Sequence, residues 1–437
     1  MSSTIVFNPC SAGLRGDFQP PGDKSISHRA AIFSLLADGV SEIRGFLRAE
    51  DTLATLAACV ALGAGVSEDQ SGGLTITGVG LSGLSAPKDG RLDMGNSGTA
   101  MRLLAGVLAA QSFSCELFGD ASLSGRPMAR IIRPLEQMGA DIEAQEGCPP
   151  LLIAATAGLQ PLAYQSPVAS AQVKSCLLLA GLCSGVDISV CEPALSRDHS
   201  ERMLAAQGAA ISVADSCVEL TATAVLQPLK MNIPADISSA AFAIVAALIV
   251  PASEITVRNI SINPTRARLI DALRAMGGEI EVLNTSEQGG EAVADLCIRS
   301  SSLKAIDVPP EWVPGMIDEF PVLMIAASLA DGVTRVRGAA ELRVKESDRI
   351  SVMVDGLNTL GVTVEEYADG FDIHGHRGFR FNGGCVDGHG DHRCAMSFLV
   401  AGLVSTAPVK VSGTEAIATS YPAFIEDMRR LGAGVQV

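Results

Sequence analysis

One short pattern occurs six times along this chain and constrains its fold more than any other feature. In each copy an apolar residue or glutamine precedes a glycine, and a β-branched residue stands three positions after that glycine. Successive glycines are 76, 69, 69, 84 and 71 residues apart. They are Gly63, Gly139, Gly208, Gly277, Gly361 and Gly432. Because each follows a helical pattern and precedes an alternating one, each predicts a helix end that leads into a strand.

The spacing of these glycines is too long for a common solenoid repeat and predicts six copies of a small α/β unit. Within a unit the patterns run in the order helix, strand, helix, strand, strand. We therefore expect an α/β fold with two lobes of three units each and a boundary near residues 226–236. The first lobe is expected to be 22–235. The second is expected to be 236–437 together with 1–21, whose strand should pair with the later units.

Composition and charge exclude several classes of protein. Apolar residues make up 48% and charged residues 18% of the chain, which is typical of a globular protein. The net charge of −16 argues against nucleic acid or an anionic membrane as a partner. A small anionic substrate remains compatible, because a few local cations can bind it. The longest uncharged apolar helix candidate, from Ala240 to about Ala252, is too short to span a bilayer, which needs about 20 residues.

Two further features concern the cellular compartment. The N-terminus lacks a basic region followed by an apolar stretch, so we see no signal peptide and expect a cytoplasmic protein. The eleven cysteines contain no Cys-x-x-Cys pair. They are therefore predicted to be free, buried thiols rather than a disulfide framework or a zinc site.

Polar residues gather where the first helix of each unit should begin. These openings are residues 23–29, 96–102, 170–174, 236–239, 318–319 and 391–393. Serine, asparagine and aspartate are good N-caps, which alone would explain their presence. Capping does not explain Lys24, Arg29, Lys174 and Arg393, because a cation in the first turn opposes the helix macrodipole. Free N–H groups beside Lys or Arg predict a site for phosphate or carboxylate.

A second group of cations stands where second helices should begin, at Arg126, Arg197 and residues 343–349. If that last segment is helical, Lys345, Glu346 and Arg349 share one face, either as a functional group or as a solvated face with internal ion pairs. Residues 387–393 contain two histidines that suggest metal ligands. The adjacent arginine at 393 would repel a cation, so a site without metal is favoured.

Six stretches resemble motifs of the 5-enolpyruvylshikimate-3-phosphate synthase family, in that family's order and across essentially the whole chain. They are residues 21–30, 95–102, 125–128, 169–175, 343–349 and 390–396. The resemblance implies transfer of the enolpyruvyl (carboxyvinyl) group of phosphoenolpyruvate to the 5-hydroxyl of shikimate 3-phosphate, with release of phosphate. It implies no metal and no cofactor. It also implies two lobes that close over the substrates, each an inside-out α/β barrel with helices inside, and we expect a monomer.

The resemblance also implies roles for individual residues. Asp318 suits the general base on the attacking hydroxyl, and Glu346 suits the acid that protonates the methylene carbon, with Lys24 as a competing donor. The residues expected to bind shikimate 3-phosphate are Ser25, Arg29, Ser170, Gln172, Arg197 and Lys345. Those expected to bind phosphoenolpyruvate are Lys24, Asn96, Gly98, Arg126, Gln172, Arg349 and Arg393. Thr99, Ala171 and Asp318 complete the substrate-binding set.

Some positions depart from the family pattern without affecting the reaction. Ala171 stands where some members have serine, Arg197 where some have tyrosine, and Thr419 where some have lysine. The alternative hypothesis is UDP-N-acetylglucosamine 1-carboxyvinyltransferase, which usually has a cysteine in the loop before its equivalent of Arg126. Residues 119–126 contain no cysteine. A non-catalytic sensor of phosphorylated ligands is disfavoured because Asp318 and Glu346 occur together.

Overall fold

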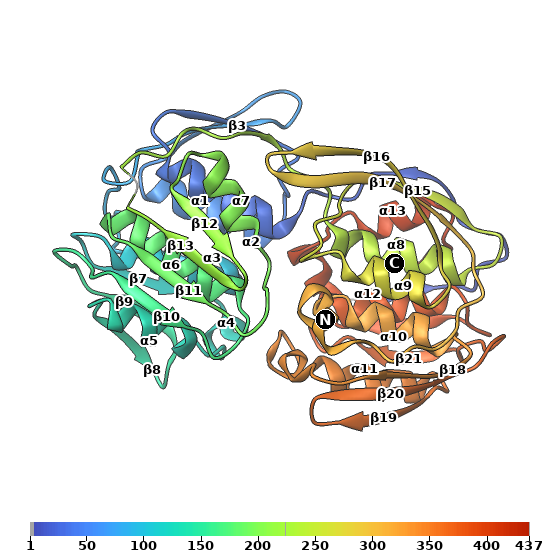
Figure 1. The fold of residues 1–437 in the computed structure, drawn as a ribbon. Coiled ribbons are helices and arrows are strands. Elements are labelled where there is room, and N and C mark those ends of the chain that lie inside the picture. Colours follow the sequence, from blue (N-terminus) through green and yellow to red (C-terminus); the bar gives the residue numbers. More distant parts are fainter. Residues whose placement is uncertain (1–3, 223, 437) are drawn as a thin grey trace. The chain divides into compact units, whose positions relative to one another are not determined.

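The computed structural model describes residues 4–222 and 224–436, and the chain divides into two units (Figure 1). Unit 2 comprises Gly22–Ile233 and Glu287–Glu291. Unit 1 comprises Met1–Pro21, Pro234–Ser286 and Ala292–Val437. Both contain helices and several small sheets, so the predicted α/β class is confirmed. Among the described residues, no helix has the length and apolar character needed to cross a bilayer.

Unit 2 contains three sheets of four strands, with the orders β14-β3-β5-β4, β6-β7-β9-β8 and β10-β11-β13-β12. In each sheet the first two strands are parallel and the remaining neighbours are antiparallel. The strands are β3 (Val40–Arg44), β4 (Gly65–Glu68), β5 (Leu74–Thr77), β6 (Arg91–Asp93), β7 (Cys115–Phe118), β8 (Ile142–Gln145), β9 (Cys148–Ile153), β10 (Leu162–Gln165), β11 (Ile188–Cys191), β12 (Ile211–Ala214), β13 (Cys217–Leu220) and β14 (Lys230–Asn232). The helices are α1 (Lys24–Leu36), α2 (Glu50–Ala61), α3 (Gly98–Ala109), α4 (Ala121–Ser124), α5 (Ala129–Gln137), α6 (Ala171–Ser184) and α7 (His199–Ala206).

Unit 1 contains the sheets β21-β22-β1-β23, β16-β17-β15-β2 and β18-β20-β19. Its strands are β1 (Thr4–Phe7), β2 (Arg15–Phe18), β15 (Glu254–Ser261), β16 (Glu279–Gln288), β17 (Glu291–Arg299), β18 (Gly332–Val336), β19 (Thr363–Tyr367), β20 (Gly370–Gly375), β21 (Gly384–Asp387), β22 (Val409–Ser412) and β23 (Val435–Gln436). Its α-helices are α8 (Ile237–Ile249), α9 (Arg268–Ala275), α10 (Phe320–Ser328), α11 (Arg349–Thr359), α12 (His392–Gly402) and α13 (Phe424–Arg430). The tip of the β16–β17 hairpin, Glu287–Glu291, belongs to unit 2. As predicted, the N-terminal strand pairs with later strands, because β1 lies between β22 and β23.

The first helices of the predicted units form the interior of each unit. In unit 1, α8, α10 and α12 pack on one another, and Figure 1 shows them side by side. In unit 2, α3 packs on α1 and α6. Nearly every residue of α8 and α10 is buried, as expected for helices that are apolar on all sides. Each unit has its own hydrophobic core around these helices.

The predicted change from helix to strand occurs at each of the six recurring glycines. They end α2, α5, α7, α9, α11 and α13, and the strands that follow are β4, β8, β12, β16, β19 and β23. All six glycines have positive φ, between 83° and 116°. Glycine adopts this conformation without the steric cost that a Cβ brings. This part of the sequence analysis is confirmed.

The prediction that the cysteines are free thiols is wrong for one pair. Cys191 at the end of β11 faces Cys217 at the start of β13, and the two form a disulfide with Cα atoms 4.0 Å apart. The other nine cysteines, all within the described residues, are free, but Cys385 is exposed and Cys10, Cys148 and Cys183 are only partly buried, so the prediction of buried thiols holds for the remaining five. Antiparallel pairing of two strands brings this pair together. No local spacing in the sequence could have indicated it.

Candidate active site

The polar residues at the expected helix openings do begin the interior helices. Side-chain caps start α1, α3, α6, α8 and α12; they are Asp23, Ser97, Ser170, Asp236 and Asp391. Helix α10 begins after Glu319, whose side chain makes no capping bond. The predicted site residues that belong to these openings therefore lie at or near helix N-termini, where backbone N–H groups favour anions.

These site residues form two sets, one in each unit. The unit 2 set contains Lys24, Ser25, Arg29, Asn96, Gly98, Thr99, Arg126, Ser170, Ala171, Gln172 and Arg197. The unit 1 set contains Asp318, Lys345, Glu346, Arg349 and Arg393.

Arg126 lies against the start of α3. Its Nη2 donates to Asn96 Oδ1 at 2.6 Å and to Ser122 Oγ at 3.3 Å. A Cβ built on Gly98 would stand 3.3 Å from Arg126 Nη1 and 2.9 Å from Arg102 Nη1. The missing side chain at this position therefore lets two guanidinium groups approach the first turn of α3.

Gln172 at the start of α6 joins that helix to α3. Its Nε2 donates to Thr99 Oγ1 at 3.0 Å, and its Oε1 accepts from Arg102 Nη1 at 2.8 Å. Arg102 also donates through Nη2 to the carbonyl of Pro127 at 3.2 Å. Arg102 was not predicted as a site residue, although it lies within the motif at residues 95–102. Its position one helical turn after Gly98 was the available signal.

Arg29 on α1 is buried and holds three helices together. Its Nη1 donates to the carbonyl of Ser25 at 3.0 Å. Its Nε donates to Ser200 Oγ on α7 at 2.7 Å, and its Nη2 donates to Ser175 Oγ on α6 at 3.0 Å. Burial lowers the pKa of Arg29 to about 10, against the opposing effect of Glu201. The guanidinium therefore stays charged at neutral pH.

The remaining members of the unit 2 set lie at element ends. Lys24 begins α1, and its Nζ lies 2.6 Å from Asp51 Oδ2 on α2. Ser170 and Ala171 are the cap and the first residue of α6. Arg197 is half-buried in the segment between β11 and α7, which begins at His199 rather than at Arg197 as expected.

Lys174 corrects one interpretation of the helix openings. We expected a cation in the first turn of a helix to require an anionic ligand. Lys174 is instead buried between two carboxylates of the chain, with Nζ 2.9 Å from Glu192 Oε2 and 2.7 Å from Glu201 Oε1. Both partners are distant in sequence, so the opening of α6 alone could not reveal them.

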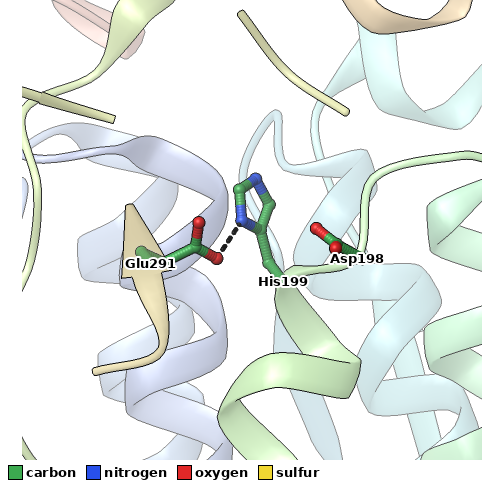
Figure 2. A group of neighbouring side chains, drawn as sticks. All are labelled: Asp198, His199 and Glu291. Carbon is green, nitrogen blue, oxygen red and sulfur yellow. Dashed lines mark hydrogen bonds and ion pairs between the residues drawn. The ribbon is translucent and has the colours of Figure 1, made fainter. Parts of the chain in front are cut away.

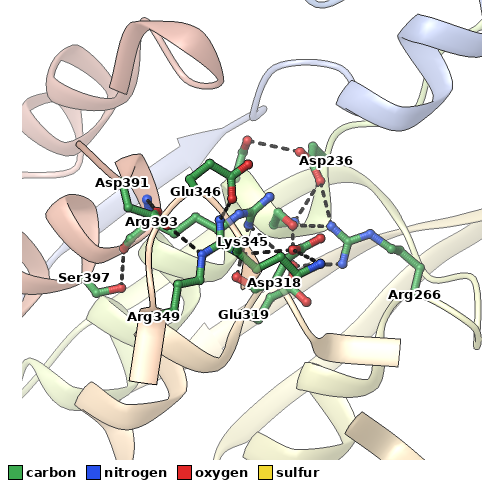
Figure 3. A network of polar contacts seen from close by, with 12 residues as sticks. Asp236, Arg266, Asp318, Glu319, Lys345, Glu346, Arg349, Asp391, Arg393 and Ser397 are labelled. Carbon is green, nitrogen blue, oxygen red and sulfur yellow. Dashed lines mark hydrogen bonds and ion pairs between the residues drawn. The ribbon is translucent and has the colours of Figure 1, made fainter. Parts of the chain in front are cut away.

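In the unit 1 set, Arg349 is the centre of a cluster of carboxylates (Figure 3). Its side chain is 1% exposed, and its Nε donates to Asp391 Oδ2 at 2.8 Å. Its Nη1 donates to Asp318 Oδ1 at 3.2 Å, and its Nη2 to Glu346 Oε2 at 2.6 Å. Burial opposes the charge of Arg349, but the carboxylates outweigh it and raise the pKa well above the usual value. The predicted base and acid thus share one buried cation.

Two further cations border Asp318. Lys345 Nζ lies 3.8 Å from Asp318 Oδ1, and burial lowers the pKa of Lys345 while this carboxylate opposes that shift. Arg393 Nη1 donates to the carbonyl of Asp318 at 3.2 Å and lies 3.8 Å from Glu319 Oε1. The structure therefore brings together all five predicted residues of the unit 1 set.

Glu319 and Asp391 were not predicted as site residues. Glu319 is buried and accepts hydrogen bonds from Arg266 Nη1 at 2.8 Å and from the hydroxyl of Ser238. Asp391 caps α12 through the N–H of Arg393 at 2.8 Å while it also holds Arg349. Capping was the only role that the sequence suggested for Asp391.

The expectation of one helical face at residues 343–349 is wrong. A short 3-10 helix ends at Val344, Lys345 is extended, and α11 begins only at Arg349. Asp348 accepts from the N–H groups of Ile350 and Ser351, which fixes the helix start at this point. The non-helical segment lets Glu346 meet Arg349 from outside the helix.

A third cluster in unit 2 lies at the start of α7 (Figure 2). His199 Nδ1 and Glu291 Oε1 are 2.7 Å apart, and both side chains are fully buried. Asp198 lies beside them and accepts from Arg202 Nε at 2.8 Å. In Figure 2 the second ring nitrogen of His199 points away from both carboxylates. The cluster fastens the hairpin tip Glu287–Glu291 to α7, a contact that the sequence analysis did not predict.

Known proteins resemble this chain over its whole length. The family model described as EPSP synthase (3-phosphoshikimate 1-carboxyvinyltransferase) matches residues 10–428. The 3-phosphoshikimate 1-carboxyvinyltransferase of Methylococcus capsulatus is 50% identical to this chain, with 99% of both chains covered. That of Sphingopyxis alaskensis is 51% identical, with 95% of both chains covered. A solved EPSP synthase from Acinetobacter baumannii is 45% identical, with a TM-score of 0.89 and both chains fully covered. The enolpyruvyl transferase NikO from Streptomyces tendae shares the fold, with a TM-score of 0.81 at 16% identity over 100% of this chain and 99% of its own.

Proposed function

This chain belongs to the EPSP synthase (3-phosphoshikimate 1-carboxyvinyltransferase) family, and we propose which of its polar residues bind the substrates and which transfer protons in the reaction of this family. The enzyme transfers the carboxyvinyl group of phosphoenolpyruvate to the 5-hydroxyl of shikimate 3-phosphate and releases phosphate, a step of aromatic amino acid biosynthesis. The names of its relatives favour this acceptor over UDP-N-acetylglucosamine, the acceptor in the alternative hypothesis.

The transfer requires three proton movements. The 5-hydroxyl loses its proton as its oxygen bonds to the central carbon of phosphoenolpyruvate, while the methylene carbon gains a proton. The methyl group so formed then loses a proton as the bond to phosphate breaks. In the proposal Asp318 takes the hydroxyl proton, and Glu346 gives and then recovers the proton on carbon. Lys24 is the competing donor for the carbon.

The observation that carries this proposal is the shared position of the two carboxylates on Arg349. Asp318 and Glu346 both accept hydrogen bonds from this buried guanidinium. A common, rigid partner holds a base and an acid at fixed positions, as proton transfer in one reaction requires. Lys345 and Arg393 add positive charge beside Asp318, which suits substrates that carry phosphate and carboxylate groups.

The binding roles follow the chemistry of the two substrates. Each carries a phosphate and a carboxylate, so several cations are needed to bind them. We assign shikimate 3-phosphate to Ser25, Arg29, Ser170, Ala171, Gln172, Arg197 and Lys345. We assign phosphoenolpyruvate to Lys24, Asn96, Gly98, Thr99, Arg126, Gln172, Arg349 and Arg393. The hydrogen bond between Gln172 and Thr99 supports placing these two residues in one binding region.

The proposal extends to the organisation of the chain. The recurring sheet topology supports six repeated units arranged as inside-out barrels with helices within. The division into two compact units supports two lobes, 22–235 and 1–21 plus 236–437. We further propose that the chain acts as a cytoplasmic monomer without a nucleic-acid partner, and its net charge of −16 supports the last point.

A comparison of acceptors tests the proposed reaction. Purified chain is mixed with phosphoenolpyruvate and either shikimate 3-phosphate or UDP-N-acetylglucosamine, and released phosphate is measured over time. We expect steady phosphate release in the mixture that contains shikimate 3-phosphate and none in the mixture that contains UDP-N-acetylglucosamine. Release with the nucleotide sugar, or with neither acceptor, would contradict the assignment.

A further inference from the structure

Glu192, directly after β11, is a buried carboxylate with four short contacts. Its Oε1 accepts from the backbone N–H of Ser170 at 2.6 Å and lies 2.9 Å from Ser196 Oγ. Its Oε2 lies 2.6 Å from the same hydroxyl and accepts from Lys174 Nζ at 2.9 Å. Its own N–H donates to the carbonyl of Ser216 at 2.9 Å, which fixes the backbone at the end of β11. One carboxylate thus links the cap of α6 to the segment that leads into α7.

Lys174 supplies a buried positive charge beside this carboxylate. The Glu192 and Lys174 side chains are each 2% exposed, and the second partner of the lysine, Glu201, is 4% exposed. Burial disfavours the lysine charge, but the two carboxylates outweigh it and raise the pKa of Lys174. A charged acceptor makes shorter and stronger hydrogen bonds than a neutral one. The lysine therefore strengthens the hydrogen bonds that Glu192 accepts from Ser170 and Ser196.

The two serines lie beside residues assigned to the acceptor. Ser170 is itself assigned to shikimate 3-phosphate, and Ser196 directly precedes Arg197. Glu192 occupies the N–H of Ser170, while the hydroxyl of Ser170 accepts from the N–H of Val173 at 3.5 Å and keeps its own proton to donate. That proton suits a phosphate oxygen. The position of the hydroxyl and the path of the following segment both depend on Glu192.

We propose that Glu192 is a positioning residue for the acceptor: it sets the α6 cap and the Ser196–Arg197 segment in the arrangement that binds the phosphate of shikimate 3-phosphate. This inference rests on the proposed function, because it needs Ser170 and Arg197 to contact that substrate. In this proposal Glu192 acts through these residues, because its carboxylate oxygens already accept hydrogen bonds from Ser170, Ser196 and Lys174. Its replacement should weaken acceptor binding more than donor binding, since its hydrogen bonds go to Ser170, Ser196 and Lys174, and none of these three is assigned to phosphoenolpyruvate.

Glu201 offers a matched control. It also binds Lys174 and is almost as deeply buried, but its contacts to Lys174 do not involve Ser170 or Ser196. Glu192→Gln and Glu201→Gln each remove one of the two negative charges that lie beside Lys174. A purely structural role predicts similar losses of melting temperature and no difference in substrate binding. A positioning role predicts a difference confined to the acceptor.

The experiment measures three quantities for wild type, Glu192→Gln and Glu201→Gln. They are the dissociation constant of shikimate 3-phosphate by calorimetry, the Michaelis constant of phosphoenolpyruvate, and kcat at saturation. For Glu192→Gln we expect the acceptor to bind about tenfold more weakly, with the other two quantities within about threefold of wild type, since a supporting contact acts through the residue that it orients. For Glu201→Gln we expect all three within about threefold.

The outcomes separate this inference from the proposed function. If the wild type does not bind shikimate 3-phosphate, both are overturned. If the wild type binds it and Glu192→Gln binds it equally well, or if both variants lose affinity equally, only the positioning role is overturned. If Glu192→Gln does not fold, Ser196→Ala replaces it, because this change releases the segment from Glu192 and leaves the Lys174 contacts in place. Wild-type acceptor affinity in Ser196→Ala would then overturn the inference.

Discussion

Replacing Lys174 with methionine tests how strongly the buried charges of unit 2 depend on one another. The ammonium lies within 2.9 Å of carboxylate oxygens of both Glu192 and Glu201, and none of the three side chains is more than 4% exposed. Methionine retains most of the length of the lysine stem and removes the charge. Two carboxylates then remain in the interior without their shared counterion.

The expected loss of stability is large. Removing one partner of a buried ion pair costs about 3–5 kcal/mol, because the remaining charge has no compensation. A unit of this size loses about 2–4 °C of melting temperature for each kcal/mol. We therefore expect Lys174→Met to melt about 6–20 °C below wild type near neutral pH.

The loss should depend on pH in a defined direction. Burial already raises the pKa of Glu201, against the opposing effect of Lys174, and removal of the ammonium should raise it further. A carboxylate whose pKa is raised in the folded state destabilises that state above its unfolded pKa of about 4.3, and the penalty disappears below this value. The difference in melting temperature between wild type and Lys174→Met should therefore become smaller as the pH falls from 8 to 5.

The difference in melting temperature between the two proteins should also become smaller at alkaline pH. The pKa of Lys174 is raised in the folded wild type, so its stabilising contribution is complete below the unfolded pKa of about 10.4. This contribution is lost as the pH rises through the folded pKa.

Thermal unfolding followed by circular dichroism at pH 5 and pH 8 measures these effects. Lys230→Met is the matched control, because Lys230 lies 3.4 Å from Glu42 in a pair whose side chains are 84% and 61% exposed. A surface pair of this kind contributes about 0–1 kcal/mol, so the control should melt close to wild type. The reasoning is refuted if Lys174→Met melts within 2 °C of wild type, or if its deficit is the same at both pH values, the control being unchanged.

Three further changes test the site. Asp318→Asn should leave shikimate 3-phosphate binding largely intact and lower turnover about 100-fold or more in a steady-state assay, whereas near-normal turnover would end the assignment of the base. Gly98→Ala places a methyl 3.3 Å from Arg126 Nη1. Because glyphosate is longer than phosphoenolpyruvate, its inhibition constant should rise by a larger factor than the Michaelis constant of the donor, and the difference should correspond to about 1–3 kcal/mol of binding free energy. Equal shifts of the two constants would exclude a role in donor selectivity. Asp391→Asn keeps a capping side chain but removes the charge that faces Arg349 Nε, so the Michaelis constant of phosphoenolpyruvate should rise about tenfold, and an unchanged constant would show that Arg349 does not need this carboxylate.

Local signals account for what the sequence predicted well. A glycine after a helical pattern predicts positive φ wherever the helix lies, and this held at all six positions. The caps Asp23, Ser97 and Ser170 each accept from an N–H group three residues away, so their chemistry is also local. Such interactions depend on neighbouring residues and can be read from a short window of sequence.

Features that depend on packing between distant segments could not be predicted in this way. Lys174 binds carboxylates of Glu192, directly after β11, and of Glu201 on α7, and both are far from the opening of α6 in the sequence. The disulfide joins Cys191 to Cys217 through strand pairing.

The helix expected from residue 343 onward failed for a different reason. Two local rules competed there, since the pattern of charges favoured a continuous face and Asp348 favoured a new cap. Asp348 prevailed because it satisfies two N–H groups at once.

Formation of the product in D2O tests most directly the claim that Asp318 and Glu346 move protons on and off the substrates. If the methylene carbon of phosphoenolpyruvate is protonated and later deprotonated, the carboxyvinyl group of the product acquires deuterium from the solvent, and mass spectrometry detects the added mass. We predict deuterium in this group with wild type and much slower labelling with Glu346→Gln. Unlabelled product formed at the wild-type rate would contradict protonation at carbon and the role proposed for Glu346.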